Sequence, residues 1–239
     1  MCFYSWRKMP AILLMLGALL SGACTENTES PQQGVSEPVS LQPVQERAGK
    51  TYVYKTYVYM CSDNSRFTAR IEGETAWLFL PSGTISLPHV EAASGAKYSD
   101  GTVTFWSKGE SAMLEGVSSS SVECKNNRAQ AIWEDAKLRG ADFRATGNEP
   151  GWHMEISKSY GIVLVTNYGS DRYQFAPSEP SSDADSRTTK YQANDGRHEL
   201  VISLEGKRCS DSMSGKEFET TVTVVIDGTK LNGCGRALH

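Results

Sequence analysis

The sequence predicts an all-β protein in which a small antiparallel barrel or sandwich is followed by a short linking helix and a second, mainly β domain. Three observations support this prediction. Apolar and polar residues alternate in short runs such as Arg66–Ile71, which is the period of a half-buried strand. Turn signals recur between these runs every eight to ten residues. The stretch 128–139 instead has the spacing of an amphipathic helix.

Residues 1–23 have the features of a secretory leader. Arg7 and Lys8 form a positive region, an apolar stretch follows, and small residues precede Cys24. The apolar stretch is shorter than the roughly 20 residues that a membrane span needs. Cys24 directly after Leu-Ser-Gly-Ala resembles a bacterial lipobox, in which cleavage exposes the cysteine and its thiol is diacylated. The alternative is an ordinary leader followed by a chance cysteine.

Residues 24–49 are predicted to form a lipidated, disordered tether, because they are rich in Ser, Glu, Gln and Pro and hold no aromatic residue. Thr25 follows the cysteine where lipoproteins retained in the inner membrane commonly carry Asp. The prediction is therefore anchorage in the outer membrane of a Gram-negative bacterium, facing the periplasm. The predicted domains that follow are 50–127 and 128–239.

The pattern is β from Tyr52 onward. The repeated Thr-Tyr-Val-Tyr at 51–54 and 56–59 is interpreted as one long strand, since it is too short for a repeat architecture. Further strand-like runs are separated by turn signals at Gly73, Pro81–Gly83, Asp100-Gly101 and Gly109. These runs are 66–71, 75–80, 102–106 and 112–115.

The predicted helix has apolar residues at i, i+3, i+4 and i+7, and Gly140 stands where a C-terminal cap glycine would. Those apolar residues are Ala129, Ile132, Trp133 and Ala136.

The β pattern resumes after the helix, with Trp152, Met154 and Ile156 alternating. Asp227-Gly228 is a strong hairpin signal. Residues 177–190 are interpreted as a long surface loop. Further strands are predicted at 162–166, 198–204 and 218–226.

Cysteine usage fits an oxidising compartment. Of six cysteines, Cys2 would leave with the leader and Cys24 would carry lipid. The remaining four allow three pairings. The favoured pairing joins Cys61 to Cys124 and Cys209 to Cys234, because each bridge then brackets one candidate domain.

No sequence motif points to an enzyme, a cofactor or a metal. The chain has no Gly-x-Ser-x-Gly, His-Glu-x-x-His, P-loop or Gly-x-Gly-x-x-Gly, and its four histidines share no metal-ligand spacing. The formal net charge is -4, and loss of Arg7 and Lys8 with the leader makes it more negative. A mildly acidic chain without a basic run is a poor candidate for binding nucleic acid.

The most informative segment is Ser94–Gly101, followed closely by Phe105–Gly109. It predicts a glycine-containing loop, a strand with two aromatic residues and a turn led by Lys108. The loop and this turn would lie at opposite ends of the strand or fold back together. A purely structural explanation places the aromatic residues in the core and the glycines in turns. It leaves Ser94 and Lys108 merely exposed.

A series of motifs strengthens the functional interpretation. They are Tyr59-x-Cys61, Phe67-x-x-Arg70, Leu80-Pro81-x-Gly83, Leu87-Pro88, Ala93-Ser94-Gly95-Ala96-x-Tyr98-x-Asp100-Gly101, Phe105-Trp106-x-Lys108-Gly109, Ala112-x-Leu114 and a closing Cys124. With these motifs, the segment from about Tyr52 to Lys125 resembles the membrane-bound lysozyme inhibitors of c-type lysozyme.

The resemblance implies an eight-stranded antiparallel barrel that binds c-type lysozyme and blocks its active-site cleft, so the protein would not be an enzyme. It implies that Ser94 and Lys108 project into the cleft, supported by Gly95, Tyr98 and Gly109, with Tyr98 bracing the loop. It also implies pairing of Cys61 with Cys124. Protection of peptidoglycan against host defence would follow.

Two other functions remain open from the sequence: a periplasmic barrel that binds a small ligand, and a structural envelope lipoprotein. A hollow barrel would favour the first and tight packing by aromatic residues would weaken it. The boxes at 147–152, 209–214 and 232–235 resemble an uncharacterised bacterial envelope lipoprotein domain, and that resemblance implies no activity. Asp211 and Met213 are interpreted as parts of a disulfide-tied corner.

Overall fold

A computed structural model describes residues 54–118 and 120–239 of the chain. The predicted leader, the candidate lipidation site Cys24 and the predicted tether lie outside these residues. Within the described ranges, no helix has the length and apolarity that crossing a membrane requires.

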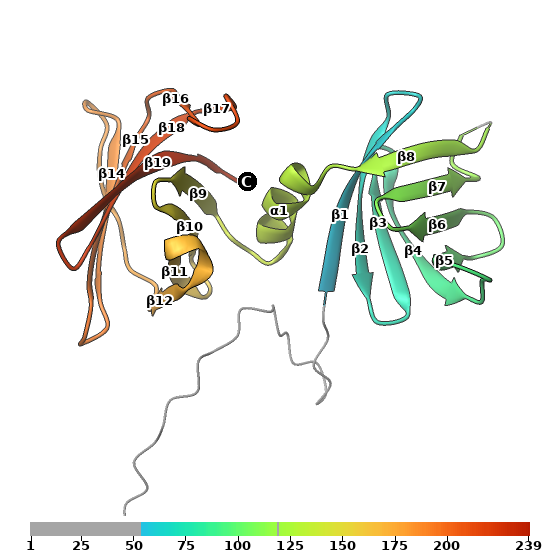
Figure 1. The fold of residues 1–239 in the computed structure, drawn as a ribbon, viewed down its shortest axis with the longest axis horizontal. Helices are drawn as coiled ribbons and strands as arrows, with labels where there is room; N and C mark the ends of the chain where they lie inside the picture. Colours follow the sequence, from blue (N-terminus) through green and yellow to red (C-terminus); the bar gives the residue numbers. More distant parts are fainter. Residues whose placement is uncertain (1–53, 119) are drawn as a thin grey trace, which may run out of the picture. The chain divides into compact units, whose positions relative to one another are not determined.

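The first half of the described chain is a closed antiparallel barrel in which each strand pairs with the next (Figure 1). The predicted barrel is therefore confirmed, and the sandwich is not formed. Its eight strands are β1 (Tyr54–Cys61), β2 (Arg66–Glu72), β3 (Thr75–Leu80), β4 (Gly83–Val90), β5 (Ala96–Ser99), β6 (Thr104–Lys108), β7 (Ser111–Glu115) and β8 (Val122–Asn126). The strand predicted over 51–59 is found from Tyr54 onward and runs to Cys61; residues 51–53 are not described.

The barrel interior is filled by side chains. In β3, Ala76 and Leu78 are fully buried, whereas Trp77 between them points outward and is 37% exposed. The rings of Tyr59, Phe67 and Phe105 meet inside the barrel, with centroids 5.3–6.0 Å apart. This spacing is typical of packed aromatic pairs.

The barrel closes at a short seam between β1 and β8. Only Tyr59, Met60 and Cys61 of β1 pair across it, against seven residues of β1 that pair with β2. Cys61 lies directly opposite Cys124, and the two form a disulfide. The covalent bond therefore reinforces a seam in which only three residues of β1 are paired.

Helix α1 (Arg128–Leu138) follows the barrel, in agreement with the prediction over 128–139. The side chain of Asn127 caps it by accepting a hydrogen bond from the backbone N–H of Gln130 (3.1 Å). Gly140 has the positive φ, +90°, of a residue that ends a helix.

The predicted apolar face of this helix is partly wrong. Trp133 and Ala136 are buried as expected, but Ile132 is 52% exposed and Ala129 is also exposed. The buried residues of the helix are Ala131, Trp133 and Ala136. Beside them, the polar residue Asp135 is held by a hydrogen bond and an ion pair. It accepts from Thr56 (2.8 Å) and pairs with Arg139 (2.8 Å).

The second half is a nine-stranded sheet in the order β12-β11-β10-β9-β19-β18-β15-β14-β13. Residues of strands far apart in this order, such as Phe175 of the edge strand β12 and Ile202 of β15, share one hydrophobic core, so the sheet curls upon itself. Its strands are β9 (Phe143–Asn148), β10 (Gly151–Ser157), β11 (Gly161–Thr166), β12 (Asp171–Phe175), β13 (Ser181–Asp183), β14 (Thr188–Asn194), β15 (Glu199–Glu205), β18 (Thr220–Ile226) and β19 (Thr229–Ala237). A short 3-10 turn, η1 (Asn167–Gly169), joins β11 to β12.

Most of the predicted strands and the hairpin turn are present in this sheet. Trp152, Met154 and Ile156 of β10 are buried as the alternation predicted. Asp227 and Gly228 join β18 to β19 with φ values of +48° and +80°, both in the left-handed region.

Two predictions for the second sheet need correction. Residues 177–190 are not simply a loop, because β13 and the start of β14 form a hairpin within them. All three residues of β13 are exposed, so no hydrophobic alternation marks the strand. The strand predicted over 218–226 is divided, and its first residue belongs to β17 (Glu217–Phe218), which pairs with β16 (Cys209–Ser210).

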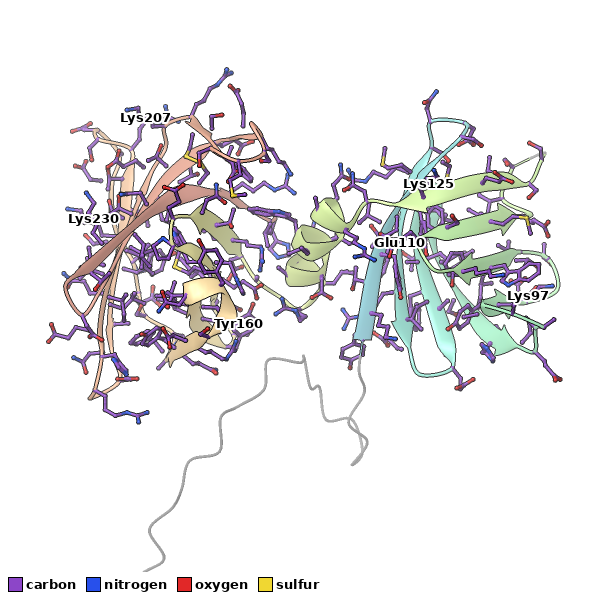
Figure 2. The ribbon with its side chains drawn as sticks, in the orientation of Figure 1. Lys97, Glu110, Lys125, Tyr160, Lys207 and Lys230 are labelled. Atoms are coloured by element: carbon purple, nitrogen blue, oxygen red, sulfur yellow. A yellow bond between two sulfur atoms is a disulfide. The ribbon has the colours of Figure 1, made fainter. Side chains whose placement is uncertain are left out.

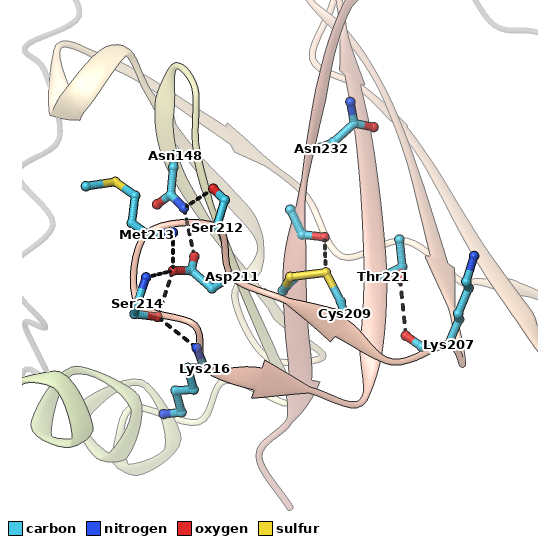
Figure 3. The surroundings of a disulfide bond; sticks show 12 residues. Asn148, Lys207, Cys209, Asp211, Ser212, Met213, Ser214, Lys216, Thr221 and Asn232 are labelled. Carbon is cyan, nitrogen blue, oxygen red and sulfur yellow. Dashed lines mark hydrogen bonds between the residues drawn. A yellow bond between two sulfur atoms is a disulfide. The ribbon is translucent and has the colours of Figure 1, made fainter.

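Cys209 and Cys234 form the second disulfide, at a corner shown in Figure 3. Asp211 organises this corner by accepting from the backbone N–H and hydroxyl of Ser214 (both 2.7 Å) and from the Asn148 amide (2.9 Å). These bonds, with Ser214 contributing most, lower the pKa of Asp211. Met213 is 79% exposed and contributes only its backbone N–H to the corner.

Candidate functional site

The Ser94 loop and the Lys108 turn lie at the same end of the β5–β6 pair. Ala96 pairs with Ser107, so the residues just before Ala96 lie beside those just after Ser107. This register decides between the two arrangements that the sequence left open: the loop and the turn fold back together.

Gly95 allows this close approach. Its φ is +72°, and a Cβ atom at this position would lie 2.4 Å from the backbone oxygen of Ser107. Both the backbone conformation and the space therefore require glycine. The same hypothetical Cβ would lie 3.3 Å from Cβ of Lys108, which shows how near the loop lies to the lysine.

Trp106 also holds the loop, through a hydrogen bond to its backbone. Its indole Nε1–H donates to the backbone oxygen of Ser94 (2.8 Å). The ammonium of Lys97, a residue labelled in Figure 2, lies 5.5 Å from the centre of the Trp106 ring. The purely structural explanation placed Trp106 in the core, and this placement is wrong because the side chain is partly exposed. Alternation does not reveal which backbone oxygen an indole will reach.

Ser94 and Lys108 are both exposed at this end of the barrel. Within the described ranges, neither the Ser94 hydroxyl nor the Lys108 ammonium has a hydrogen-bond or ion-pair partner. The nearby carboxylate of Glu110 accepts instead from Asn126 (2.9 Å) and pairs with Arg128. Gly109 continues the turn with φ +61° and open space around it. An exposed hydroxyl and an exposed cation therefore lie on a loop and a turn that meet at one end of the barrel.

The other end of β5–β6 carries a separate turn. The carboxylate of Asp100 accepts from the backbone N–H groups of Thr102 and Val103 (both 2.8 Å), and these bonds lower its pKa. The conspicuous Asp100-Gly101 pair thus shapes the β5–β6 turn and is not next to Lys108.

Tyr98 faces the barrel core and is 4% exposed. Its ring stacks on Phe105 (centroids 6.0 Å apart) and meets His89 edge-on (5.3 Å). Burial raises the pKa of the Tyr98 hydroxyl. A role of Tyr98 in binding a partner can therefore only be indirect, through the position of β5.

A hollow of about 750 Å³ adjoins Lys108 on the outside of the barrel. Its lining includes the outward-facing Met60, Trp106 and Met113 but none of the aromatic rings that pack in the barrel core. Because these rings fill the interior, the packing weighs against a ligand carried inside the barrel.

Comparisons with known proteins concern the barrel half of the chain. Residues 59–122 match the family described as membrane-bound lysozyme-inhibitor of c-type lysozyme. A protein of Yersinia enterocolitica serotype O:8 / biotype 1B, named membrane-bound lysozyme inhibitor of C-type lysozyme, is 58% identical over 38 residues. The match covers 16% of this chain and 32% of the relative, so the chain spans about a third of that relative's length.

Among solved structures, the crystal structure of Pseudomonas aeruginosa MliC in complex with hen egg white lysozyme is similar at 27% sequence identity. The match covers 40% of this chain and 100% of that chain, with a TM-score of 0.29. The resemblance inferred from the sequence motifs is confirmed by the family match over residues 59–122. The family and the curated relative are named as inhibitors and not as enzymes.

Proposed function

We propose that this protein inhibits c-type lysozyme, on the premise that residues 59–122 carry the domain of the family named above. One observation carries the proposal. Ser94 and Lys108 are both exposed at the same end of the barrel, and the Lys108 ammonium forms no ion pair within the described ranges. Gly95 and Trp106 hold these two residues together before any partner arrives, which reduces the entropy lost on binding.

The chemistry of the enzyme's cleft suits this pair. Lysozyme works with a protonated glutamic acid and an ionised aspartate in one groove. The Lys108 ammonium pairs with the aspartate, and the Ser94 hydroxyl hydrogen-bonds the acid. Both contacts lose water when the loop and turn enter the cleft, so truncating either side chain costs about 2–5 kcal/mol of binding.

The proposal includes attachment to the outer membrane through lipid on Cys24, with the barrel in the periplasm. Two features support it: the leader that ends at a cysteine, and Thr25 in the position where Asp favours retention in the inner membrane. In this place the protein protects peptidoglycan from lysozyme that has crossed the outer membrane. The acidic balance of the chain also suits a basic partner.

Lysis of a peptidoglycan suspension by a c-type lysozyme tests the proposal, with the purified full chain titrated into the assay. We expect inhibition by the parent chain and a tenfold or greater loss of potency in Ser94→Ala and in Lys108→Ala. Ser210→Ala and Lys230→Ala are matched controls, because both residues are exposed in the second half of the chain. Circular dichroism establishes that each variant is folded.

Undiminished lysis with the folded parent chain in large excess would reject inhibition. Full potency in both Ser94→Ala and Lys108→Ala would keep inhibition but reject this loop and turn as its site.

A further inference from the structure

A group of arginine side chains lies on the face of the second sheet that is turned away from its hydrophobic core. Trp152, Met154 and Ile156 of β10 face that core, so His153 and Glu155 project from the other side. Across the sheet, Glu155 pairs with Arg144 of β9. His153 pairs with Val165 of β11, which in turn pairs with Arg172 of β12.

The two carboxylates of this group are already engaged. The Arg139 guanidinium donates to both oxygens of Glu155 (2.8 Å each) and through Nε to Asp135 (2.8 Å). Glu155 also accepts from Arg144 and from the Tyr160 hydroxyl (3.2 Å). These bonds lower the pKa of Glu155 against the opposing effect of burial, so the carboxylate stays ionised.

Positive charge remains in excess after these bonds are counted. Arg172 forms no ion pair with any residue in the described ranges, and its buried Nη2 has no hydrogen-bond partner. Arg144 is only 8% exposed, and its Nε is likewise without a partner. A buried donor without a partner destabilises a fold, and more so when it carries charge. An acceptor supplied by a ligand would remove that cost.

These side chains line a cavity of about 670 Å³, which is a typical volume for a small-molecule site. The sheet and the helix contribute four arginines and two carboxylates to its lining. They are Arg128, Arg139, Arg144, Arg172, Asp135 and Glu155. Strand β1 of the barrel also lines the cavity and adds the exposed Lys55. Arg128 pairs with Glu110, so the partly buried share of the excess positive charge lies at Arg144 and Arg172.

His153 lies between these two arginines in the lining. Burial, followed by the charge of Arg144, lowers the pKa of His153 to about 4, and Arg172 acts in the same direction. The imidazole is therefore neutral near pH 7 and offers one N–H donor.

We propose that this cavity binds the oxyanion of a small ligand, a carboxylate or a phosphate, through Arg144, His153 and Arg172. Planar guanidinium groups hold such oxyanions with paired, charge-assisted hydrogen bonds. A purely structural role explains Arg139, which ties α1 to the sheet, but it does not explain Arg172, which makes no such bond. This inference does not rest on lysozyme inhibition.

Nuclear magnetic resonance of the purified full chain tests the site at pH 7. Inorganic phosphate and, separately, succinate are titrated against chloride at equal ionic strength, and the backbone amides of Arg144, His153 and Arg172 are followed. We expect saturable shifts at these amides with at least one of the two probes. Phosphate and succinate distinguish a phosphate-bearing from a carboxylate-bearing ligand.

Arg172→Gln is the informative variant, because it removes a charge without breaking an ion pair of the fold. We expect it to weaken binding at least tenfold and Arg172→Lys to weaken it less. Arg197→Gln is the matched control, at an exposed arginine in the turn between β14 and β15, and leaves binding unchanged. The proposal is overturned if neither probe gives saturable shifts, or if the Arg172 variants bind as tightly as the parent.

Discussion

At the scale of single residues, His153 makes the stability of the second sheet depend on pH. Its pKa is about 4 in the folded chain, against 6.5 for an ordinary histidine. Between these values the unfolded chain binds a proton that the folded chain does not. The contribution of His153 is therefore fully present above pH 6.5 and is lost as the pH falls toward 4.

Between pH 7 and pH 5, we expect the free energy of unfolding to fall in the parent chain and to fall less in His153→Gln. The difference between the two falls should be about 1–2 kcal/mol, which allows for the partial exposure of the ring. Urea titrations in buffers free of phosphate and carboxylate, followed through the resonances of β10, measure this difference. His239→Gln, at the exposed C-terminal residue, should behave as the parent. Equal pH dependence of the free energy of unfolding in the parent and in His153→Gln would show that His153 is not its source.

Sequence patterns predicted single residues well where one strand decides their place. Alternation placed Trp152 and Met154 in the core. The motif resemblance singled out Ser94 and Lys108 as site residues, which stays a prediction. It did not place Ser94 next to Lys108, because the register between two strands depends on pairing and not on either strand alone. The exposed Ile132 was missed for a similar reason, since the packed face of α1 depends on its partners.

At the scale of elements, the closure of the barrel depends on the disulfide at the β1–β8 seam. The bridge joins residues 63 apart in sequence, and the seam beside it pairs only three residues of β1. The loop-entropy model assigns a bridge of this length about 4 kcal/mol of stability. The double variant Cys61→Ser/Cys124→Ser should therefore lose about 3–4 kcal/mol in the unfolding of the barrel.

Urea unfolding followed through barrel resonances measures this loss. The double variant Cys209→Ser/Cys234→Ser is the matched control, because its bridge joins β16 to β19 in the second sheet. An unfolding midpoint of the barrel that stays constant in Cys61→Ser/Cys124→Ser would show that backbone pairing alone holds the seam.

Several strands that sequence reasoning found have one buried face. β3, β15 and β18 alternate between buried and more exposed residues, so their period was visible. β11 was also predicted, although all six of its residues are buried. β13 is exposed throughout and owes its conformation to pairing with β14, which no local pattern reveals. The number of barrel strands came from the family resemblance for the same reason, since closure is a property of the whole sheet.

At the scale of the whole molecule, the barrel and the second sheet each have a hydrophobic core and a disulfide of their own. The proposed place at the membrane depends on the predicted leader and on Cys24, at the end of a polar stretch of about 25 residues.

Replacing Cys24 separates anchoring from inhibition. In cells, we expect the parent chain to incorporate labelled palmitate and to sediment with outer membranes, because several acyl chains hold a protein durably. Cys24→Ser should take up no label and appear in the soluble periplasmic extract, while its purified form inhibits lysozyme as well as the parent does. Cys2→Ser is the matched control and should behave as the parent, because the predicted cleavage removes Cys2 with the leader. Palmitate on Cys24→Ser would instead place the anchor elsewhere, and sedimentation of the parent with inner membranes would reject the interpretation of Thr25.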